Sequence, residues 1–370
     1  MARQKLTFLL PSLRGGGAER VILTLSQLMV KKGYSVDLVL VRSTGAFKTE
    51  VPADVNLIDL GHSRAAFSLI SLARYIRQSR PDVLLPSLPH ITIITLITKW
   101  LCRYTLVTLP IEHNTLSALL ANSKSPKQTL LPLLMRITYP TANKIICVSR
   151  GVEKDLKTTL SLPDHKLTVI YNPVNTSSLI QLSQHPTNHP WLKNRSSPLL
   201  LAVGRLTYAK GFDVLINAMS IVHAKSKAKL IILGEGPEKS RLHELIQDTG
   251  LSECISIPGF TNNPYPYFKR ASLFVLSSRW EGLPTVLIEA IACGAKVIST
   301  DCPSGPREIL GANAERYLVP VGDHCALATK ILETLDGHLD NHNQVDLDKF
   351  TEAYAQKEYH RLIRQELDAY

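Results

Sequence analysis

The stretch SRWEGLPTVLIEAIACG, residues 278–294, decides the fold of the second half of this 370-residue chain. The apolar run 273–276 before it predicts a buried strand, and proline at 284 suits the first turn of a helix. The helix interior is almost entirely apolar, Gly294 ends the helix, and residues 296–300 predict the next strand. The stretch is therefore one unit of an α/β fold in which strands and helices alternate.

Two carboxylates in this stretch suggest a ligand. Glu281 lies in the loop, whereas Glu289 lies inside the apolar run, where a carboxylate is costly unless it is hydrogen-bonded. A vicinal diol, such as a ribose, would satisfy both oxygens of Glu289. Free amides at the helix start suit a phosphate or sugar oxygen. The residues expected to contact such a ligand are Gly282, Leu283, Pro284 and Thr285. The alternative is that neither glutamate binds a ligand: Glu281 would be an ordinary loop residue and Glu289 would lie on the solvent-exposed edge of an amphipathic helix.

Length and composition favour a globular protein of two domains. The chain is 45% hydrophobic, and its six cysteines show no C-x-x-C spacing, which predicts reduced thiols in a cytosolic protein. The apolar run 6–13 is followed by Arg14 and three glycines, so it predicts a first strand rather than a signal peptide. The longest apolar stretch, 83–98, is too short and too interrupted to span a membrane.

The net charge of +11 is unevenly distributed. Residues 1–190 carry 22 Lys+Arg and 10 Asp+Glu, whereas residues 191–370 carry 20 and 21. The first half therefore suits an anionic partner: nucleic acid, an anionic membrane surface or a phosphorylated lipid. A helix predicted over 65–80, with arginines at three-residue spacing, either lies on headgroups or is an ordinary outer helix. The leucine-rich segment 116–137, with Lys124 and Lys127, is expected to be mobile or to face a membrane.

Three loops that follow predicted strands carry further candidate residues. Gly15, Gly16 and Gly17 separate a strand from a helix, an arrangement that either lets amides approach a phosphate or forms a turn without a ligand. Arg205 and Lys210 emerge five residues apart from another such loop, where two cations can neutralise a diphosphate or simply be surface charges. His113 follows a strand end, where ligands bind in open α/β sheets, although a lone histidine can also be structural.

These motifs together resemble family 4 of the retaining glycosyltransferases. The match extends over nearly the whole chain, in the family's order, and the segments that carry it are E-x7-E from Glu281 to Glu289, G-G-A-E-R at 16–20, N-P-V at 172–174, G-R-x4-K-G at 204–211, G-x-G-P at 234–237 and Gly259-Phe260. The resemblance implies the GT-B fold, with two Rossmann-like doubly wound domains, an interdomain cleft and a final helix that crosses back to the first domain.

The resemblance also implies domain bounds and site roles. The expected bounds are an acceptor-binding domain over 1–175 with the helix 350–370, a linker over 176–197 and a nucleotide-sugar-binding domain over 198–349. Glu281 would contact the sugar, Glu289 the ribose, and Arg205 and Lys210 the diphosphate, while His113 and the glycine loop complete the site. The remaining donor contacts expected are Gly204, Gly234 and Phe260. The resemblance also implies front-face attack on the sugar within an ion pair, with neither a cofactor nor a metal ion.

The expected donor is a nucleotide-sugar, with UDP favoured over GDP by the resemblance alone. The expected acceptor is a polyprenyl diphosphate-linked saccharide at the inner face of the plasma membrane, which suits the basic first half. A soluble-acceptor enzyme that uses a GDP-sugar stays open. A nucleic-acid-binding protein is disfavoured because aromatic content is 6% and no DNA- or RNA-binding signature occurs. A dehydrogenase would need G-x-G-x-x-G after a strand, and the Gly15 loop lacks that spacing. A GT-B epimerase or an inactive nucleotide-sugar binder is disfavoured because the charged residues Glu281, Glu289, Arg205 and Lys210 are all present.

Overall fold

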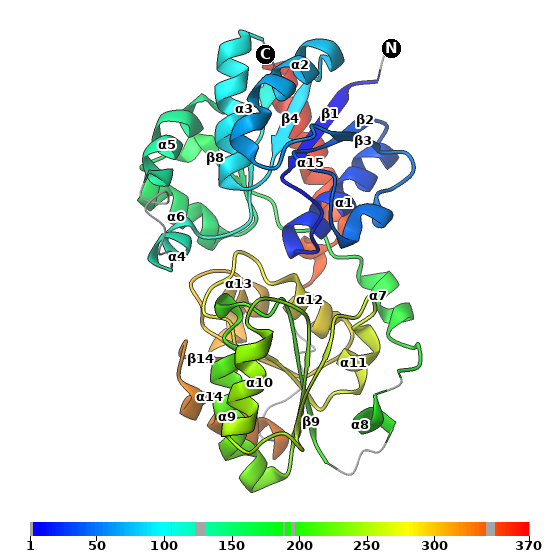
Figure 1. Cartoon of the computed structure of the whole chain (residues 1–370), viewed down its shortest axis with the longest axis vertical. Helices are drawn as coiled ribbons and strands as arrows, with labels where there is room; N and C mark the ends of the chain where they lie inside the picture. Colours follow the sequence, from blue (N-terminus) through cyan, green and yellow to red (C-terminus); the bar gives the residue numbers. More distant parts are fainter. Residues whose placement is uncertain are drawn as a thin grey trace. The chain divides into compact units, whose positions relative to one another are not determined.

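The chain forms two compact units. The computed structural model describes residues 3–104, 106–122, 130–187, 189–193, 197–337 and 345–369. Unit 1 comprises Met1–Pro173 and Lys349–Tyr370, and unit 2 comprises Val174–Asp348. The sheets of both units are parallel and flanked by helices (Figure 1), which confirms the prediction of two Rossmann-like domains.

Unit 1 is built on a five-stranded parallel sheet of order β3-β2-β1-β4-β5, with a three-stranded sheet β6-β7-β8. Central strand β1 pairs with β2 and β4, so the strand order reverses there. Its inner side chains are buried, as in a strand covered on both faces. The strands are β1 (Lys5–Leu10), β2 (Ser35–Leu40), β3 (Asn56–Asp59), β4 (Val83–Pro86), β5 (Val107–Thr108), β6 (Ile111–Glu112), β7 (Ile145–Cys147) and β8 (Leu167–Val169).

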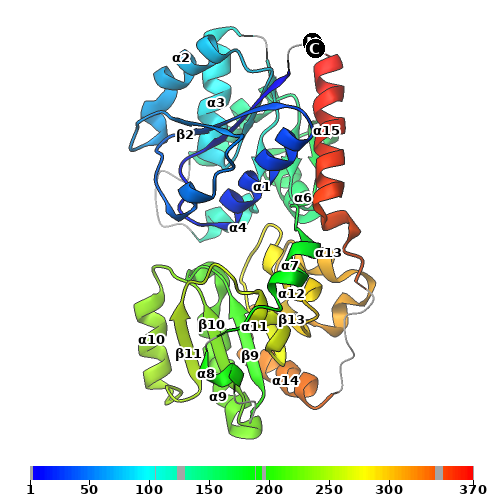
Figure 2. The ribbon, with the colours of Figure 1, turned by 90° about the vertical axis from the view of Figure 1, so that its right-hand side faces the viewer.

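The helices of unit 1 include the last helix of the chain. Helix α15 packs on α1, where Gln356 Nε2 donates to the Leu28 carbonyl at 2.8 Å and Tyr34 Oη lies 2.8 Å from His360 Nδ1. Figure 2 shows α15 beside α1, as predicted for a helix that returns to the first domain. The helices are α1 (Gly17–Lys31), α2 (Leu69–Ser79), α3 (Pro89–Cys102), α4 (Leu116–Ala121), α5 (Leu131–Thr138), α6 (Arg150–Leu160) and α15 (Glu352–Asp368), with short 3-10 turns η1 (Ala46–Glu50), η2 (Ala65–Ser68), η4 (Tyr139–Thr141), η5 (Asp164–Lys166) and η8 (Asp348–Phe350).

Unit 2 has one six-stranded parallel sheet of order β11-β10-β9-β12-β13-β14. The order reverses between β9 and β12, which pair through Leu200 and Leu273. The strands are β9 (Leu199–Val203), β10 (Lys229–Leu233), β11 (Ile255–Gly259), β12 (Leu273–Leu276), β13 (Val297–Thr300) and β14 (Leu318–Val319). The helices are α7 (Thr176–Leu182), α8 (Pro190–Lys193), α9 (Phe212–Ser226), α10 (Lys239–Asp248), α11 (Tyr265–Arg270), α12 (Thr285–Ala292), α13 (Pro306–Leu310) and α14 (His324–Leu335), with η6 (Tyr208–Lys210) and η7 (Gly311–Arg316).

The structure corrects two element predictions and places two helices in the expected linker. The apolar run 106–111 predicts a single strand, but it forms two short strands, β5 and β6, in different sheets, with Pro110 between them. Residues 301–309, with two prolines and a glycine, predict a loop, but this loop ends early because Pro306 begins α13. The expected linker 176–197 contains α7 and α8, and the Asn175 side chain caps α7 by accepting from the Ser178 amide at 3.0 Å. Lys124 and Lys127 lie outside the described residues.

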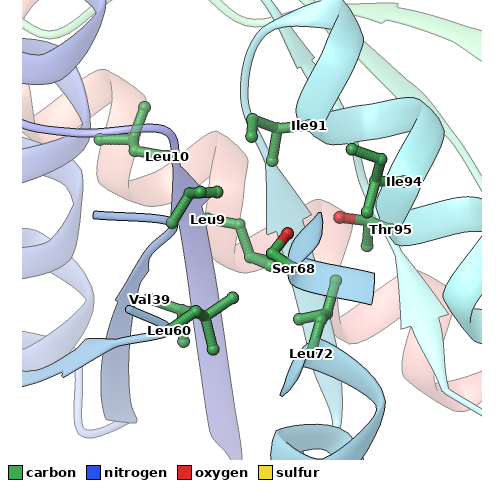
Figure 3. A pocket seen from close by; sticks show the side chains of 10 residues that line it. Leu9, Leu10, Val39, Leu60, Ser68, Leu72, Ile91, Ile94 and Thr95 are labelled. Carbon is green, nitrogen blue, oxygen red and sulfur yellow. The ribbon is translucent and has the colours of Figure 1, made fainter. Parts of the chain in front are cut away.

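The interior of unit 1 contains one small cavity between β1, β2 and the helices α2 and α3 (Figure 3). Its lining is apolar apart from Ser68 and Thr95, and its volume is about 10 Å³, room for roughly one water molecule. This space is therefore too small for a sugar or nucleotide. No helix among the described residues is both long and apolar enough to cross a membrane.

Candidate functional site

The candidate residues of unit 2 gather where the order of its sheet reverses. Gly204 follows β9, and the segment that holds Glu281 follows the neighbouring strand β12. Because all strands run parallel, their carboxyl ends lie along one edge of the sheet. Crevices at such reversals are where ligands bind in open α/β sheets.

An ion pair joins two of the predicted residues at this reversal of strand order. Lys210 Nζ lies 2.5 Å from Glu281 Oε1, and Ser278 Oγ donates to the same carboxylate oxygen at 2.6 Å. The Glu281 side chain is only 9% exposed and that of Lys210 is 22% exposed. Burial makes the interaction stronger than at an open surface and makes the loss of either partner costly. The two residues stand 71 positions apart, so the fold alone brings them together.

Close contacts between the two loops fix this pair. Gly211 has φ +60°, and a Cβ atom there would lie 2.1 Å from the Ser277 carbonyl oxygen, so only glycine fits. Ser277 Oγ in turn donates to the Lys210 carbonyl at 2.9 Å. The backbone that carries Lys210 is therefore held against the backbone that leads to Glu281.

A second charged cluster supports the same loops. Arg279 makes a two-pronged contact with Asp213, with both N–O distances 2.8 Å, and its guanidinium lies 4.0 Å from the centre of the Tyr208 ring. Burial acts to raise the pKa of Asp213, but the hydrogen bonds and charge of Arg279 outweigh it and lower the pKa. The cluster stays charged and holds η6 against the loop after β12. No sequence signal pointed to it, because Asp213 and Arg279 are 66 positions apart.

The other predicted cation and carboxylate of unit 2 are more open. Arg205 is exposed and makes no ion pair with any residue that the structure describes. Glu289 is half-buried on the second turn of α12. Pro284, the N-cap residue of α12, makes no side-chain capping hydrogen bond. Ser304 Oγ holds the preceding loop by donating to the Gly282 carbonyl at 2.7 Å. Leu283 and Pro284 are buried, and Thr285 begins the helix half-buried.

The remaining predicted donor residues lie at the ends of β9, β10 and β11. Gly204 and Gly234 touch closely: a Cβ atom on Gly234 would lie 1.9 Å from the Gly204 carbonyl oxygen. Phe260 directly follows β11 and is 52% exposed, unusual for so large an apolar ring. Glycine at 234 therefore allows the ends of β9 and β10 to approach closely, and the exposed Phe260 ring follows the next strand, β11.

Unit 1 holds the other predicted residues. Gly15, with φ +99°, and Gly16 lead into α1, which begins at Gly17 without a side-chain cap. His113 follows β6 and is 7% exposed, and neither ring nitrogen has a hydrogen-bond partner among the described residues. Burial lowers its pKa to about 4, so the ring is neutral near pH 7. A buried imidazole with two unused nitrogens is unusual, because buried polar groups are normally hydrogen-bonded.

Glu112, directly before His113, is a buried carboxylate that sequence reasoning passed over. It accepts a hydrogen bond from the Tyr139 hydroxyl. Burial raises its pKa to about 7, although the Tyr139 hydrogen bond acts in the opposite direction. The available signal was its place at the end of an apolar strand, where a charge requires a partner.

Comparison with known proteins identifies the family. The family model described as "Glycosyltransferase Family 4" matches residues 15–178, and the model described as "Glycosyl transferases group 1" matches residues 186–350. The chain belongs to glycosyltransferase family 4. As a family 4 enzyme of the GT-B fold it is a glycosyltransferase, as the motifs predicted.

Relatives of this family 4 enzyme are similar along most of its length. An N-acetylgalactosamine-N,N'-diacetylbacillosaminyl-diphospho-undecaprenol 4-alpha-N-acetylgalactosaminyltransferase of Campylobacter jejuni is 29% identical and aligns over 96% of this chain and 93% of its own. The amylovoran biosynthesis glycosyltransferase AmsD of Erwinia amylovora is also 29% identical, over 80% of each chain. The solved structure of Anabaena HepE in complex with UDP and glucose shares the fold, with a TM-score of 0.79 at 18% identity over 98% of this chain and 100% of that one.

Proposed function

We propose that this enzyme transfers a hexose or N-acetylhexosamine from a UDP-sugar to a polyprenyl diphosphate-linked saccharide, with retention of anomeric configuration. The reaction would serve polysaccharide or glycan assembly at the inner face of the plasma membrane. The observation that carries the proposal is the buried Lys210–Glu281 pair at the strand-order reversal, beside an exposed Arg205. The name of the Campylobacter relative supports the acceptor class, that of the Erwinia relative supports polysaccharide assembly, and the HepE complex supports UDP.

In this proposal the donor lies along the carboxyl ends of β9–β12. Arg205 and Lys210 bind the diphosphate, and Glu289 accepts hydrogen bonds from the ribose hydroxyls. Glu281 accepts hydrogen bonds from the sugar and keeps Lys210 in place before the donor arrives. Phe260 lies beside the base, and the helix start from Gly282 to Thr285 faces sugar or phosphate oxygens.

The chemical step follows from where negative charge develops. As the bond between the anomeric carbon and the diphosphate oxygen breaks, that charge grows on the leaving group, and Arg205 and Lys210 stabilise it. The acceptor hydroxyl attacks the anomeric carbon from the same face, and its proton passes to the departing phosphate oxygen. The neutral His113 ring can donate to a sugar or acceptor hydroxyl from one nitrogen and accept at the other. Two cationic side chains supply the charge that a metal ion would otherwise provide, so we expect EDTA to leave turnover unchanged.

A donor screen tests the proposal. Thermal stabilisation and slow hydrolysis are measured with a panel of UDP- and GDP-sugars for the wild type, Lys210→Ala, Glu281→Ala and the control Lys330→Ala. Lys330 pairs with Glu333 on α14 and is 24% exposed, close to the 22% of Lys210, so its loss removes a similarly buried lysine from the same unit outside the proposed site. One UDP-sugar should stabilise and be hydrolysed by the wild type and the control, and far less by the other two. Equal, negligible responses from all four proteins would overturn the site, and a response to GDP-sugars alone would overturn the choice of UDP.

A further inference from the structure

One helical layer of unit 1 exposes most of the large apolar side chains found at the surface. Of the twelve such side chains that are exposed in the described part of the chain, eight lie on or next to η2, α2, α3 and α5, which we call the α2–α3–α5 layer. The most exposed are Trp100 at 75%, Ile70 at 72%, Ile137 at 64% and Phe67 at 61%. Scattered surface hydrophobics are ordinary, but a concentration on one layer marks an interaction surface.

The helices of this layer are neighbours. Helix α2 packs against α3, and α3 packs against α5 (Figure 1). Each also buries apolar residues elsewhere on its surface, such as Leu72 on α2, Leu96 on α3 and Met135 on α5. Each helix thus has one set of apolar residues that packs in the core and a second set that is exposed. The stability of the fold explains the first set but not the second.

The charge of the same region is one-sided. Residues 60–152 contain 11 Lys+Arg but only two acidic residues, Asp82 and Glu112. Asp82 accepts a hydrogen bond from the Lys5 amide at 2.6 Å, and Glu112 is buried. On the layer itself Arg74, Arg77 and Arg136 are exposed, and η2, α2, α3 and α5 contain no acidic residue. A surface with exposed cations, exposed apolar side chains and no carboxylates is complementary to anionic headgroups over an acyl interior.

We propose that the α2–α3–α5 layer docks the enzyme on an anionic lipid bilayer. Trp100 and Ile137 enter the boundary between headgroups and acyl chains, and Arg74, Arg77 and Arg136 contact lipid phosphates. Such docking rests on the proposed function, because it would hold unit 1 where a polyprenyl-linked acceptor is embedded. Nucleic acid would use the cations but would leave the aliphatic side chains unexplained.

Vesicle binding tests this surface. Co-sedimentation is measured with vesicles of phosphatidylcholine alone and with added phosphatidylglycerol, for the wild type, Trp100→Ser/Ile137→Ser and the control Ile180→Ser/Val321→Ser. The control removes two exposed apolar side chains of unit 2, 51% and 40% exposed. The wild type and control should bind anionic vesicles at low salt, and more weakly at high salt. The Trp100→Ser/Ile137→Ser variant should partition at least about tenfold more weakly, given the area that it no longer buries.

Two further readouts separate this proposal from its rivals. Brominated lipids should quench tryptophan emission in the wild type but much less in Trp100→Phe, and UDP should stabilise the wild type and every variant equally. Wild type that ignores anionic vesicles, or Trp100→Ser/Ile137→Ser that binds as tightly as the wild type, would overturn the docking surface. So would a wild-type dimer that the same variant converts to a monomer, because a second copy would then cover the layer. A protein that binds vesicles but does not respond to UDP would contradict the proposed donor and leave the docking surface standing.

Discussion

Replacing Lys210 by methionine separates the structural and catalytic roles of the ion pair. Among the described residues, the change leaves the Glu281 carboxylate, which is 9% exposed, with the Ser278 hydroxyl as its remaining side-chain hydrogen-bond donor. Removing one partner of a buried pair costs about 3–5 kcal/mol, and the partial exposure of Lys210 reduces this to about 2 kcal/mol. For a unit of this size the melting temperature should fall by about 4–8 °C. Losing one of two cations on the leaving diphosphate should lower kcat by about 10²–10³-fold.

The double variant Lys210→Met/Glu281→Gln makes this prediction decisive. Replacing both partners by neutral groups of similar shape should restore most of the lost stability, because no uncompensated charge stays buried. The activity of the double variant should not exceed that of Lys210→Met. The assays are thermal denaturation and single-turnover transfer at saturating donor, with Lys330→Met as the control. Recovery of activity together with stability would refute the reasoning, since the pair would then be structural only.

Two further predictions concern buried groups. The pKa of Glu112 is about 7 in the folded protein and near 4.5 in the unfolded chain, so the wild type loses stability as pH rises from 5 to 8. Glu112→Gln cannot ionise and should not show this loss. The free energy of unfolding of the variant, relative to that of the wild type, should therefore rise by at most about 3 kcal/mol between pH 5 and pH 8. Urea titrations at both pH values measure this, and a pH-independent difference would contradict the burial of that carboxyl. Gly234→Ala should weaken UDP binding by about tenfold or more and lower the melting temperature, because its Cβ would lie 1.9 Å from the Gly204 carbonyl oxygen. Calorimetry and thermal denaturation check this, and unchanged affinity would show that the contact between the two loops is dispensable.

The alternation of strands and helices could be predicted from the sequence because apolar runs and helix signals are local. The apolar run 273–276 predicted a strand and the stretch 278–294 predicted a loop and a helix, and the structure has β12 and α12 there. The split between β5 and β6 could not be predicted in this way, because a single apolar run crosses from one sheet to another at Pro110. Which sheet a short strand joins depends on contacts with distant strands.

The candidate site shows the same division between local and distant information. Glu281, Lys210 and Arg205 were predicted from loop positions, but the direct pairing of Glu281 with Lys210 depends on β9 and β12 being neighbours. The Asp213–Arg279 contact likewise has no local signal. The basic character of the first half was visible in the sequence, whereas the joint exposure of Trp100 and Ile137 required the packing of α3 on α5.

The most direct test of the central claim compares the binding of UDP and uridine by titration calorimetry. The difference between these ligands isolates the diphosphate, which we assign to Arg205 and Lys210. The wild type and Lys330→Ala should bind UDP about a hundredfold or more tightly than uridine, as expected for two charge-assisted contacts. Arg205→Ala/Lys210→Ala should bind the two ligands with similar affinity while uridine affinity stays unchanged. A double variant that keeps the full preference for UDP would contradict the claim that these two loops bind the activated sugar.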